Sequence, residues 1–278
     1  MELTFLVENN SLIGTQFQAE PGLSIFIRVD DREVLFDAGY SDAFMINARR
    51  KGIDLLHLDW IALSHGHFDH TWGLDHLIRH YFEAAIHKMD HARPRLVAHP
   101  KAFMSKRKDA VPELGMLLAE EKLSTQFDLT LTETPTWLTE SLVTLGEVER
   151  VLDFEGHSTL GERMEKDGPV ADDLPDDTAL ACVTDTGLVV ISGCAHAGIC
   201  NTIEQAKRVT GVDNVRAVLG GFHLQKAKPE RLDPTADYLA ALGLEGLWCC
   251  HCTDLAAKIS LAAKCPVREV GSGMTLKF

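Results

Sequence analysis

The stretch Ser64-His65-Gly66-His67-Phe68-Asp69-His70 carries four potential metal ligands within six consecutive positions. Imidazole and carboxylate groups are common ligands of divalent transition metals, and the glycine between the first two histidines lets the backbone bend. On an extended strand, side chains two positions apart point the same way, so His65, His67 and Asp69 can share one side. His70 breaks that alternation. The spacing therefore predicts a metal site in which a strand that ends in a loop divides its donors between two neighbouring ions.

The sequence on both sides of this stretch favours a strand before it and a helix after it. Residues 58–63 (LDWIAL) are mostly apolar, which is typical of a short buried strand. Residues 71–80 (TWGLDHLIRH) place Leu74, Leu77 and Ile78 at helical spacing. Because open α/β sheets carry their sites at the carboxyl ends of strands, we expect the donors at the edge of a sheet.

The composition is ordinary for a globular protein and argues against two classes of partner. The chain has 278 residues, of which 45% are hydrophobic and 24% charged, and its net charge is −14. That charge argues against a nucleic-acid backbone or an anionic membrane as the main partner. The seven cysteines form no even framework of spaced pairs, and neither a signal peptide nor a run of ~20 apolar residues is evident. We therefore expect a cytoplasmic protein.

The two halves of the chain repeat one pattern of strand, hairpin and helix. In the first half we expect strands at 3–7 and 58–63, a hairpin of 23–29 with 33–36, and a helix at about 41–51. In the second half we expect a hairpin of 180–183 with 187–191, strands at 215–219, 246–250 and 274–278, and helices at 201–209, about 234–242 and about 254–263. Asn201 is the expected N-cap of the helix at 201–209, with Glu204 three residues later.

The middle of the chain, at about 100–176, differs in character. It begins with a basic cluster, continues through a helix-like stretch at 112–123, and becomes acidic with glycine and proline over 162–177. We interpret 100–176 as an insertion or lid over the site of a single domain, 1–278. No short-period repeat or low-complexity tract is evident.

Three later histidines share the setting of the first motif. His196, His223 and His251 each follow an apolar strand and precede a turn or helix. Strands of one sheet that end on the same edge would bring these side chains to a single cleft. His196 and His251 are predicted metal ligands, whereas His223 could be a proton donor or a substrate contact. Asp37 also follows a strand, and it either supports the site or caps a turn.

These motifs resemble those of the metallo-β-lactamase-fold proteins, which are marked by the pattern H-x-H-x-D-H, present here from His65 to His70. Within that family the chain is most similar, nearly from end to end, to the branch of 7,8-dihydropterin-6-yl-methyl-4-(β-D-ribofuranosyl)aminobenzene 5′-phosphate synthases. The stretches that carry the resemblance to the branch are 7–12, 35–39, 64–70, 98–100, 176–180, 192–198, 220–224 and 251–253.

The resemblance implies an α/β (α+β) fold, a four-layer αββα sandwich with the metals at one edge between the sheets. It implies one or two divalent metal ions, with zinc expected and manganese, iron or nickel also suited to the donors. The implied ligands are His65, His67 and His196 for the first ion, and Asp69, His70 and His251 for the second. Asp69 and His223 are the expected catalytic residues.

The chain departs from the family at one position. Many members carry an aspartate that bridges the two metals at a strand end in the second half. The corresponding places, 191–194 and 219–222, contain no aspartate. Either Cys194 or His196 takes over this role, or water alone forms the bridge.

The function that the resemblance favours is a transferase of the pterin pathway acting on a phosphorylated small molecule. The alternatives are a metal-hydroxide phosphodiesterase or other hydrolase, and a non-catalytic metal-binding sensor. A redox protein with a di-iron centre is less consistent with these ligand types. Two adjacent metals would clamp a phosphoryl or acyl oxygen.

Residues outside the metal motif were considered for substrate binding. The predicted contacts are His99, Lys101 and Asp177, and a nearby basic cluster of Lys106, Arg107 and Lys108 could receive a phosphate or simply form a solvated helix face. The run 249–252 (CCHC) lacks a second spaced pair for a structural zinc site, so its adjacent cysteines are expected to face opposite sides of a buried strand.

Overall fold

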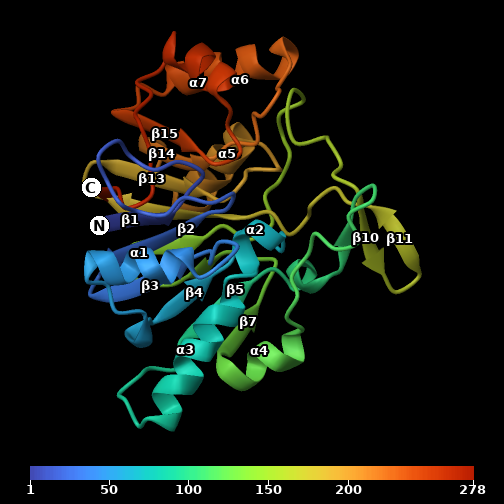
Figure 1. Ribbon diagram of the computed structural model, residues 1–278. Coiled ribbons are helices and arrows are strands. Elements are labelled where there is room, and N and C mark those ends of the chain that lie inside the picture. Colours follow the sequence, from blue (N-terminus) through green and yellow to red (C-terminus); the bar gives the residue numbers. More distant parts are fainter.

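The hydrophobic strands of the two halves pair into two large sheets that lie face to face, as the computed structural model of residues 1–278 shows (Figure 1). The first sheet has the strand order β16 (Thr275–Lys277), β1 (Glu2–Val7), β2 (Ser24–Val29), β3 (Arg32–Phe36), β4 (Trp60–Ala62), β5 (Arg95–Ala98) and β7 (Asp128–Leu131). The second has the order β15 (Gly246–Cys250), β14 (Val215–Gly221), β13 (Gly187–Ser192), β12 (Ala179–Thr184), β9 (Leu142–Thr144) and β8 (Thr136–Trp137).

Helices cover the outer faces of both sheets (Figure 1). Those on the first sheet are α1 (Ala43–Lys51), α3 (Leu74–Ile86) and α4 (Glu120–Gln126), and those on the second are α5 (Ile199–Thr210), α6 (Pro229–Ala241) and α7 (Leu255–Ala262). Short elements complete the chain: η1 (Leu55–His57), α2 (Phe68–Thr71) and η2 (Pro100–Phe103). None of the helices combines the length and the apolar composition that a membrane span requires.

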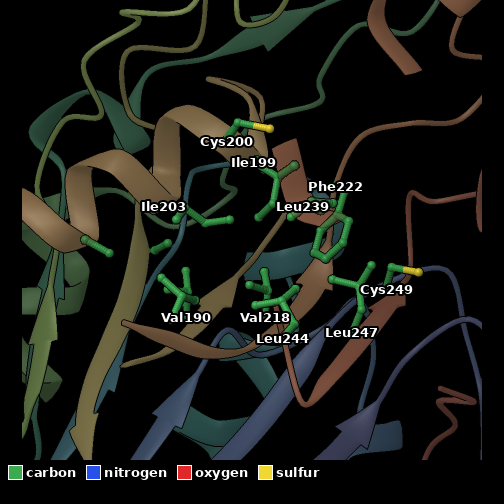
Figure 2. Packing of buried hydrophobic residues seen from close by; sticks show 14 of the residues in the cluster. Val190, Ile199, Cys200, Ile203, Val218, Phe222, Leu239, Leu244, Leu247 and Cys249 are labelled. Atoms are coloured by element: carbon green, nitrogen blue, oxygen red, sulfur yellow. The ribbon is translucent and has the colours of Figure 1, made fainter. Parts of the chain in front are cut away.

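Alternation along the strands produces the four layers. On β14, Ala217 and Leu219 belong to the core between the sheets, whereas Val218 belongs to the core under α5–α7 (Figure 2). On β1, Leu3 and Phe5 likewise face the second sheet. Leu6 and Val7, at the end of the same strand, pack in the core under α1 and α3. Because successive side chains on a strand point to opposite faces, each buried strand contributes to two cores. The αββα sandwich expected from the sequence is confirmed.

Most expected elements are present, and two differ from expectation. The helix expected at 201–209 begins at Ile199 with Gly198 as its N-cap, so the capping role predicted for Asn201 is wrong. The Asn201 side chain is buried and accepts hydrogen bonds from the backbone N–H groups of Val151 and Leu152, both at 2.9 Å. That long-range use of an asparagine leaves no signal in the local sequence.

The helix expected at 112–123 is confined to α4, Glu120–Gln126. Residues before it are held in an irregular loop, because the Glu113 carboxylate accepts hydrogen bonds from the backbone N–H groups of Lys106 and Gly115 at 2.9 and 2.6 Å. A side chain that binds nearby backbone groups competes with helix formation.

The segment 100–176, interpreted from the sequence as an insertion or lid, divides into two kinds of structure. Its β7 extends the first sheet, and β8 and β9 extend the second. A small separate sheet of β11 (Gly168–Ala171), β10 (Glu162–Glu165) and β6 (Lys106–Arg107) projects beside α2 (Figure 1). Only this small sheet and the loops around it lie outside the sandwich.

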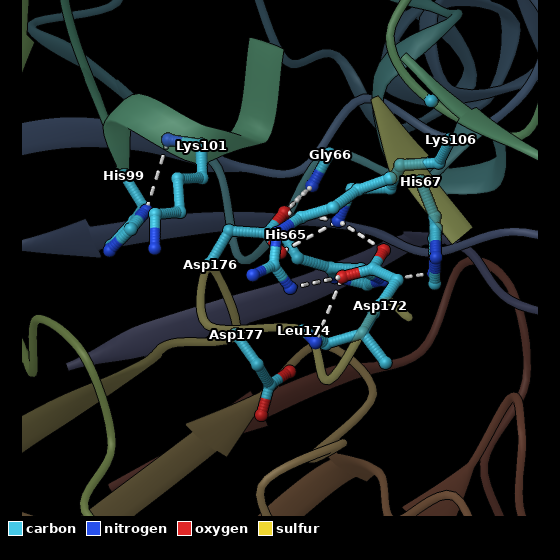
Figure 3. A network of polar contacts seen from close by, with 12 residues as sticks. His65, Gly66, His67, His99, Lys101, Lys106, Asp172, Leu174, Asp176 and Asp177 are labelled. Carbon is cyan, nitrogen blue, oxygen red and sulfur yellow. Dashed lines mark hydrogen bonds and ion pairs between the residues drawn. The ribbon is translucent and has the colours of Figure 1, made fainter. Parts of the chain in front are cut away.

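A buried ion pair ties the small sheet to the loop after β4 (Figure 3). The Lys106 ammonium lies 2.7 Å from one carboxylate oxygen of Asp176 and 3.4 Å from Asp172, and its side chain is 1% exposed. The other Asp176 oxygen accepts a hydrogen bond from the backbone N–H of Gly66 at 2.8 Å. Lys106 is therefore occupied by structural contacts, and the sequence-based idea that it receives a phosphate is wrong.

Removing this lysine should destabilise the fold. We expect Lys106→Ala to lower the free energy of unfolding by about 3–5 kcal/mol, because Asp176 and Asp172 would lose the cation that offsets their burial. The neighbouring Arg107→Ala is the matched control: Arg107 pairs with Glu162 at an exposed site, where an ion pair contributes about 0–1 kcal/mol. Urea denaturation measures both, and equal losses would contradict the assignment.

Candidate metal centre

The motif that opens the sequence spans a loop and a short helix. His65 and His67 lie in the loop after β4, and Asp69 and His70 lie in α2, which begins at Phe68. The strand alternation predicted for these residues therefore extends no further than His67, whose backbone is still extended at φ −67° and ψ 152°. The helical turn, rather than a strand, brings Asp69 and His70 to the same place as the first two histidines.

The second half contributes histidines from three neighbouring strand ends. The strands β13, β14 and β15 are parallel, so their carboxyl ends share one edge, and His196, His223 and His251 follow them in that order. Left-handed backbone occurs at His223 and His251, with φ of 48° and 52°, and at Ala195 beside His196, with φ of 51°. Such conformations cost free energy in non-glycine residues and often occur at functional sites.

His65, His67 and His196 form the first group of donors. His65 Nε2 and His67 Nδ1 lie 2.9 Å apart, and the ring of His196 lies 4.9 and 5.0 Å from theirs, centroid to centroid. His196 Nε2 is buried and has no hydrogen-bond partner. A buried nitrogen without a partner is costly unless a cation occupies the adjacent space.

Asp69, His70 and His251 form the second group. His70 Nε2 and His251 Nε2 face each other at 3.2 Å. The Asp69 carboxylate lies 3.4 Å from His251 Nε2 and 3.9 Å from His70 Nε2. The structure thus brings the six predicted ligand residues close to one another, with His65 and His70 linking the two groups at a ring separation of 4.3 Å.

Asp37 orients donors in the first half of the site. This fully buried carboxylate accepts hydrogen bonds from the Ser64 backbone N–H and hydroxyl, both at 2.7 Å, and lies 2.7 Å from His70 Nδ1. The Ser64 hydroxyl in turn contacts His65 Nδ1 at 2.9 Å. Of the two roles considered for Asp37, the structure favours support of the site, because a partner on one ring nitrogen fixes which nitrogen faces a metal.

The protonation states of His65, His67 and His196 suit metal binding, whereas His70 would have to give up a proton on binding an ion. Burial lowers the pKa of His65 and His196 well below the usual range and that of His67 to about 3, so these rings are neutral at pH 7. Burial also acts on His70, but the Asp37 and Asp69 charges outweigh it and raise the pKa of this ring to about 9. Neutral imidazoles with converging nitrogens and a nearby carboxylate fit a divalent cation.

A cavity of about 440 Å³ opens over both groups. It is lined by His67, Asp69, His196 and His251 and also by His223, whose Nδ1 is buried without a partner. No lysine or arginine lines this cavity.

Three residues predicted to contact substrate lie elsewhere than in the cavity lining (Figure 3). His99 Nδ1 accepts a hydrogen bond from the backbone N–H of Lys101 at 3.1 Å and caps η2. Asp177 accepts a hydrogen bond from the backbone N–H of Ala197 at 2.9 Å and so supports the loop that carries His196.

Some residues of the cavity had no predicted role in substrate or metal binding. Asn9 contacts His251 Nδ1 through its amide oxygen at 2.9 Å and fixes that ring. Cys252 lines the cavity next to His251 in sequence. The position of Cys252 directly after a predicted ligand was a signal that could have found it. Asn9 lies in the stretch 7–12 that carries the resemblance, but no local pattern marks its contact with a partner 242 residues away.

An apolar groove of about 450 Å³ continues from the cavity, sharing Pro21, Phe68 and Leu114 with it. Its aromatic residues form a cluster in which the Tyr40 and Trp72 rings stack at 5.6 Å, with Phe68 edge-on to Tyr40 at 5.9 Å. The site therefore pairs a polar floor with an aromatic wall.

Comparisons with known proteins identify the family to which the chain is similar. The sequence model of the metallo-beta-lactamase superfamily matches residues 18–209. A protein of Methanocaldococcus jannaschii named 7,8-dihydropterin-6-methyl-4-(beta-D-ribofuranosyl)-aminobenzene-5′-phosphate synthase is 33% identical over 269 residues, covering 91% of this chain and 87% of that protein. An uncharacterized protein of the same archaeon is 29% identical, covering 94% of this chain and 93% of that one.

A solved structure matches over the whole chain. The crystal structure of Tm1679, described as a metal-dependent hydrolase of the beta-lactamase superfamily, has a TM-score of 0.83 and 26% identity, covering 100% of this chain and 99% of that one.

Loss of the Asp37 carboxylate should weaken metal binding. We expect Asp37→Asn to lower the affinity for Zn²⁺ about 10–100-fold, because His70 and Ser64 lose the acceptor that orients them. Competition with a chromogenic chelator measures the affinity. Asp59→Asn is the control, since Asp59 precedes β4 and bonds to Arg32 and Glu33 away from the cavity; equal weakening in both variants would contradict the role given to Asp37.

Proposed function

Because the chain belongs to the metallo-beta-lactamase superfamily, we propose that it is a metal-dependent enzyme that joins a dihydropterin to a ribosylated aminobenzene phosphate. The enzyme class follows from the family and from the named relatives. The transferase reaction is the finer part of the proposal, and it is supported by the 33% identity with the synthase along nearly the whole chain.

The observation that carries the proposal is the convergence of six donors, four of which line one cavity. His65, His67 and His196 would hold one metal ion, and Asp69, His70 and His251 a second. Bound divalent metals supply a Lewis acid that stabilises negative charge on phosphoryl oxygens. The histidine-rich donors suit zinc, and manganese, iron or nickel could also bind.

The absence of cationic side chains from the cavity gives this metal site a second role. A phosphorylated substrate approaches a protein of net charge −14, and no lysine or arginine lines the cavity to receive it. Bound metal would then have to supply the positive charge that binds the phosphate. In this proposal, both substrate affinity and catalysis depend on the bound metal.

The aromatic groove fits the ring systems of the proposed substrates. Flat rings pack favourably against aromatic side chains, and the cluster of Tyr40, Phe68 and Trp72 lies directly beside the cavity. Phe68 lines both the groove and the cavity, so a ring held there would present its substituent to the metal floor.

His223 is the proposed proton acceptor. In the condensation, the aminobenzene nitrogen attacks the methylene carbon of a pterin pyrophosphate, a C–N bond forms, and the C–O bond to the pyrophosphate breaks. The attacking amine loses one proton. His223 Nδ1 is buried without a partner at the cavity wall, which suits it to accept that proton. The small sheet of β6, β10 and β11 would have to limit the access of water.

A metal-dependent phosphodiesterase or other hydrolase is the second candidate. The likeness to Tm1679, described as a metal-dependent hydrolase, favours it. The same set of metal-binding residues would serve hydrolysis if water reached the reacting phosphorus or carbonyl carbon.

The two candidates differ in the product they form. Zinc-loaded protein supplied with a dihydropterin-methyl pyrophosphate and 4-(β-D-ribofuranosyl)aminobenzene 5′-phosphate should release pyrophosphate and form the condensed product, detected by mass spectrometry. Hydrolysis of an aryl phosphodiester should be feeble. Failure to condense with zinc, manganese, iron or nickel would sink the transferase, and rapid diester hydrolysis would then favour the hydrolase.

Variants in the same assay test the proposed metal ligands and the aromatic groove separately. His196→Ala should abolish the reaction because it removes a proposed ligand. Trp72→Ala should raise KM roughly two- to tenfold, since one aromatic contact contributes about 0.5–1.5 kcal/mol. Trp137→Ala, an exposed tryptophan at the edge of the second sheet, is the control and should leave KM unchanged.

A further inference from the structure

We propose that Cys194 is a sulfur ligand shared by the two metal positions. This inference rests on the proposed metal site and adds a residue to it. Cys194 was one of several possibilities that the sequence left open, alongside His196 and water. The structure favours Cys194 because of where its sulfur lies.

The Cys194 sulfur lies close to two donors of each group. Together with His65 and His196 it forms one set of potential ligand atoms that all lie within 4.8 Å of one another. With His70 and His251 it forms a second such set. His70 Nε2 is only 3.3 Å from the sulfur. Because the Cys194 sulfur is part of both sets, this one atom is placed to contact two ions.

The backbone around Cys194 holds the sulfur in this position. Gly193 is pressed against Ser64, since a Cβ at this glycine would lie 2.1 Å from the Ser64 hydroxyl oxygen. Ala195, on the other side, has the left-handed φ of 51° noted above. The Cys194 residue itself is only 4% exposed and lines the cavity. The loop therefore brings Cys194 against the motif of the first half at the cost of backbone strain.

No other acidic group takes this central place. Asp69 lies with the second group, Asp37 is committed to Ser64 and His70, and Asp177 supports the backbone at Ala197. His196 cannot be the shared ligand on this geometry, because its potential ligand set includes His65 but neither His70 nor His251. A thiolate carries the same single negative charge as the missing aspartate, and a thiol that coordinates a metal is deprotonated.

Cys252 is close to Cys194 but is placed differently. It groups with Cys194 and His223, and its sulfur accepts a hydrogen bond from the backbone N–H of His223 at 3.1 Å. It shares a set with neither His65 nor His70. Cys252 is therefore the natural comparison: a second cavity cysteine whose removal should leave the shared ligand intact.

A sulfur ligand also narrows the class of metal. Thiolates favour borderline and soft ions such as Zn²⁺, Co²⁺ and Fe²⁺, whereas Mg²⁺ and Mn²⁺ prefer oxygen. The site should consequently bind Zn²⁺ and Co²⁺ far more tightly than Mg²⁺.

Cobalt substitution tests the proposal without any assay of activity. Full-length metal-free protein is titrated with Co²⁺, and the near-ultraviolet absorption that arises from thiolate-to-cobalt charge transfer is recorded together with the bound metal per chain. We expect the wild-type protein and Cys252→Ser to show the band, and Cys194→Ser to lose it and to bind Co²⁺ at least tenfold more weakly. Cys182→Ser, a buried cysteine between the sheets, should behave as wild type.

Cys194→Asp keeps the test decisive if the serine variant folds poorly. This variant restores a carboxylate bridge, so it should bind two Co²⁺ ions per chain but show no charge-transfer band. The proposal is overturned if Cys194→Ser or Cys194→Asp binds Co²⁺ with the full wild-type band, or if the wild type binds two Co²⁺ without one. A wild type that shows the band but no transferase or hydrolase activity would leave the sulfur ligand standing and refute only the proposed function. A wild type that binds no Co²⁺ would refute both.

Discussion

The buried carboxylate of Asp37 is the contact on which the rest of the site depends. Asp37 follows β3 and accepts hydrogen bonds from the N–H and hydroxyl groups of Ser64, which follows β4. It also contacts the His70 ring in α2, so it connects three consecutive pieces of the first half. The glycine at position 193 is close enough that a Cβ there would lie 3.2 Å from the same carboxylate. One side chain thereby sets the spacing between the first motif and the loop that carries Cys194.

The layers of the fold could be predicted because they arise from local patterns. Alternation along β14 and the opposite facing of Cys249 and Cys250 follow from the geometry of a strand, and both are confirmed. The predictions that were wrong concern side chains that act over long separations. Lys106 pairs with Asp176 across 70 positions, and Asn201 bonds to the backbone 49 and 50 positions away. No local pattern in the chain marks either contact.

The candidate ligand residues could be predicted from the sequence, but their backbone setting could not. The alternation of a strand suggested how His65, His67 and Asp69 would share a side, whereas a turn of α2 places Asp69 and His70. The Lys106–Asp176 pair also reaches Gly66, and so links the small sheet to the loop between the first two histidines. Movement of that sheet would act directly on the donors.

The central claim is that two metal ions share the sulfur of Cys194 as a ligand. The most direct measurement is anomalous diffraction at the zinc edge from a crystal grown with Zn²⁺. The account predicts two peaks in the cavity, one within about 2.3 Å of donor atoms of His65, His67 and His196 and one near Asp69, His70 and His251, with the Cys194 sulfur within that distance of both. A cavity without a peak, or two zinc ions with the Cys194 sulfur bound to neither, would contradict it.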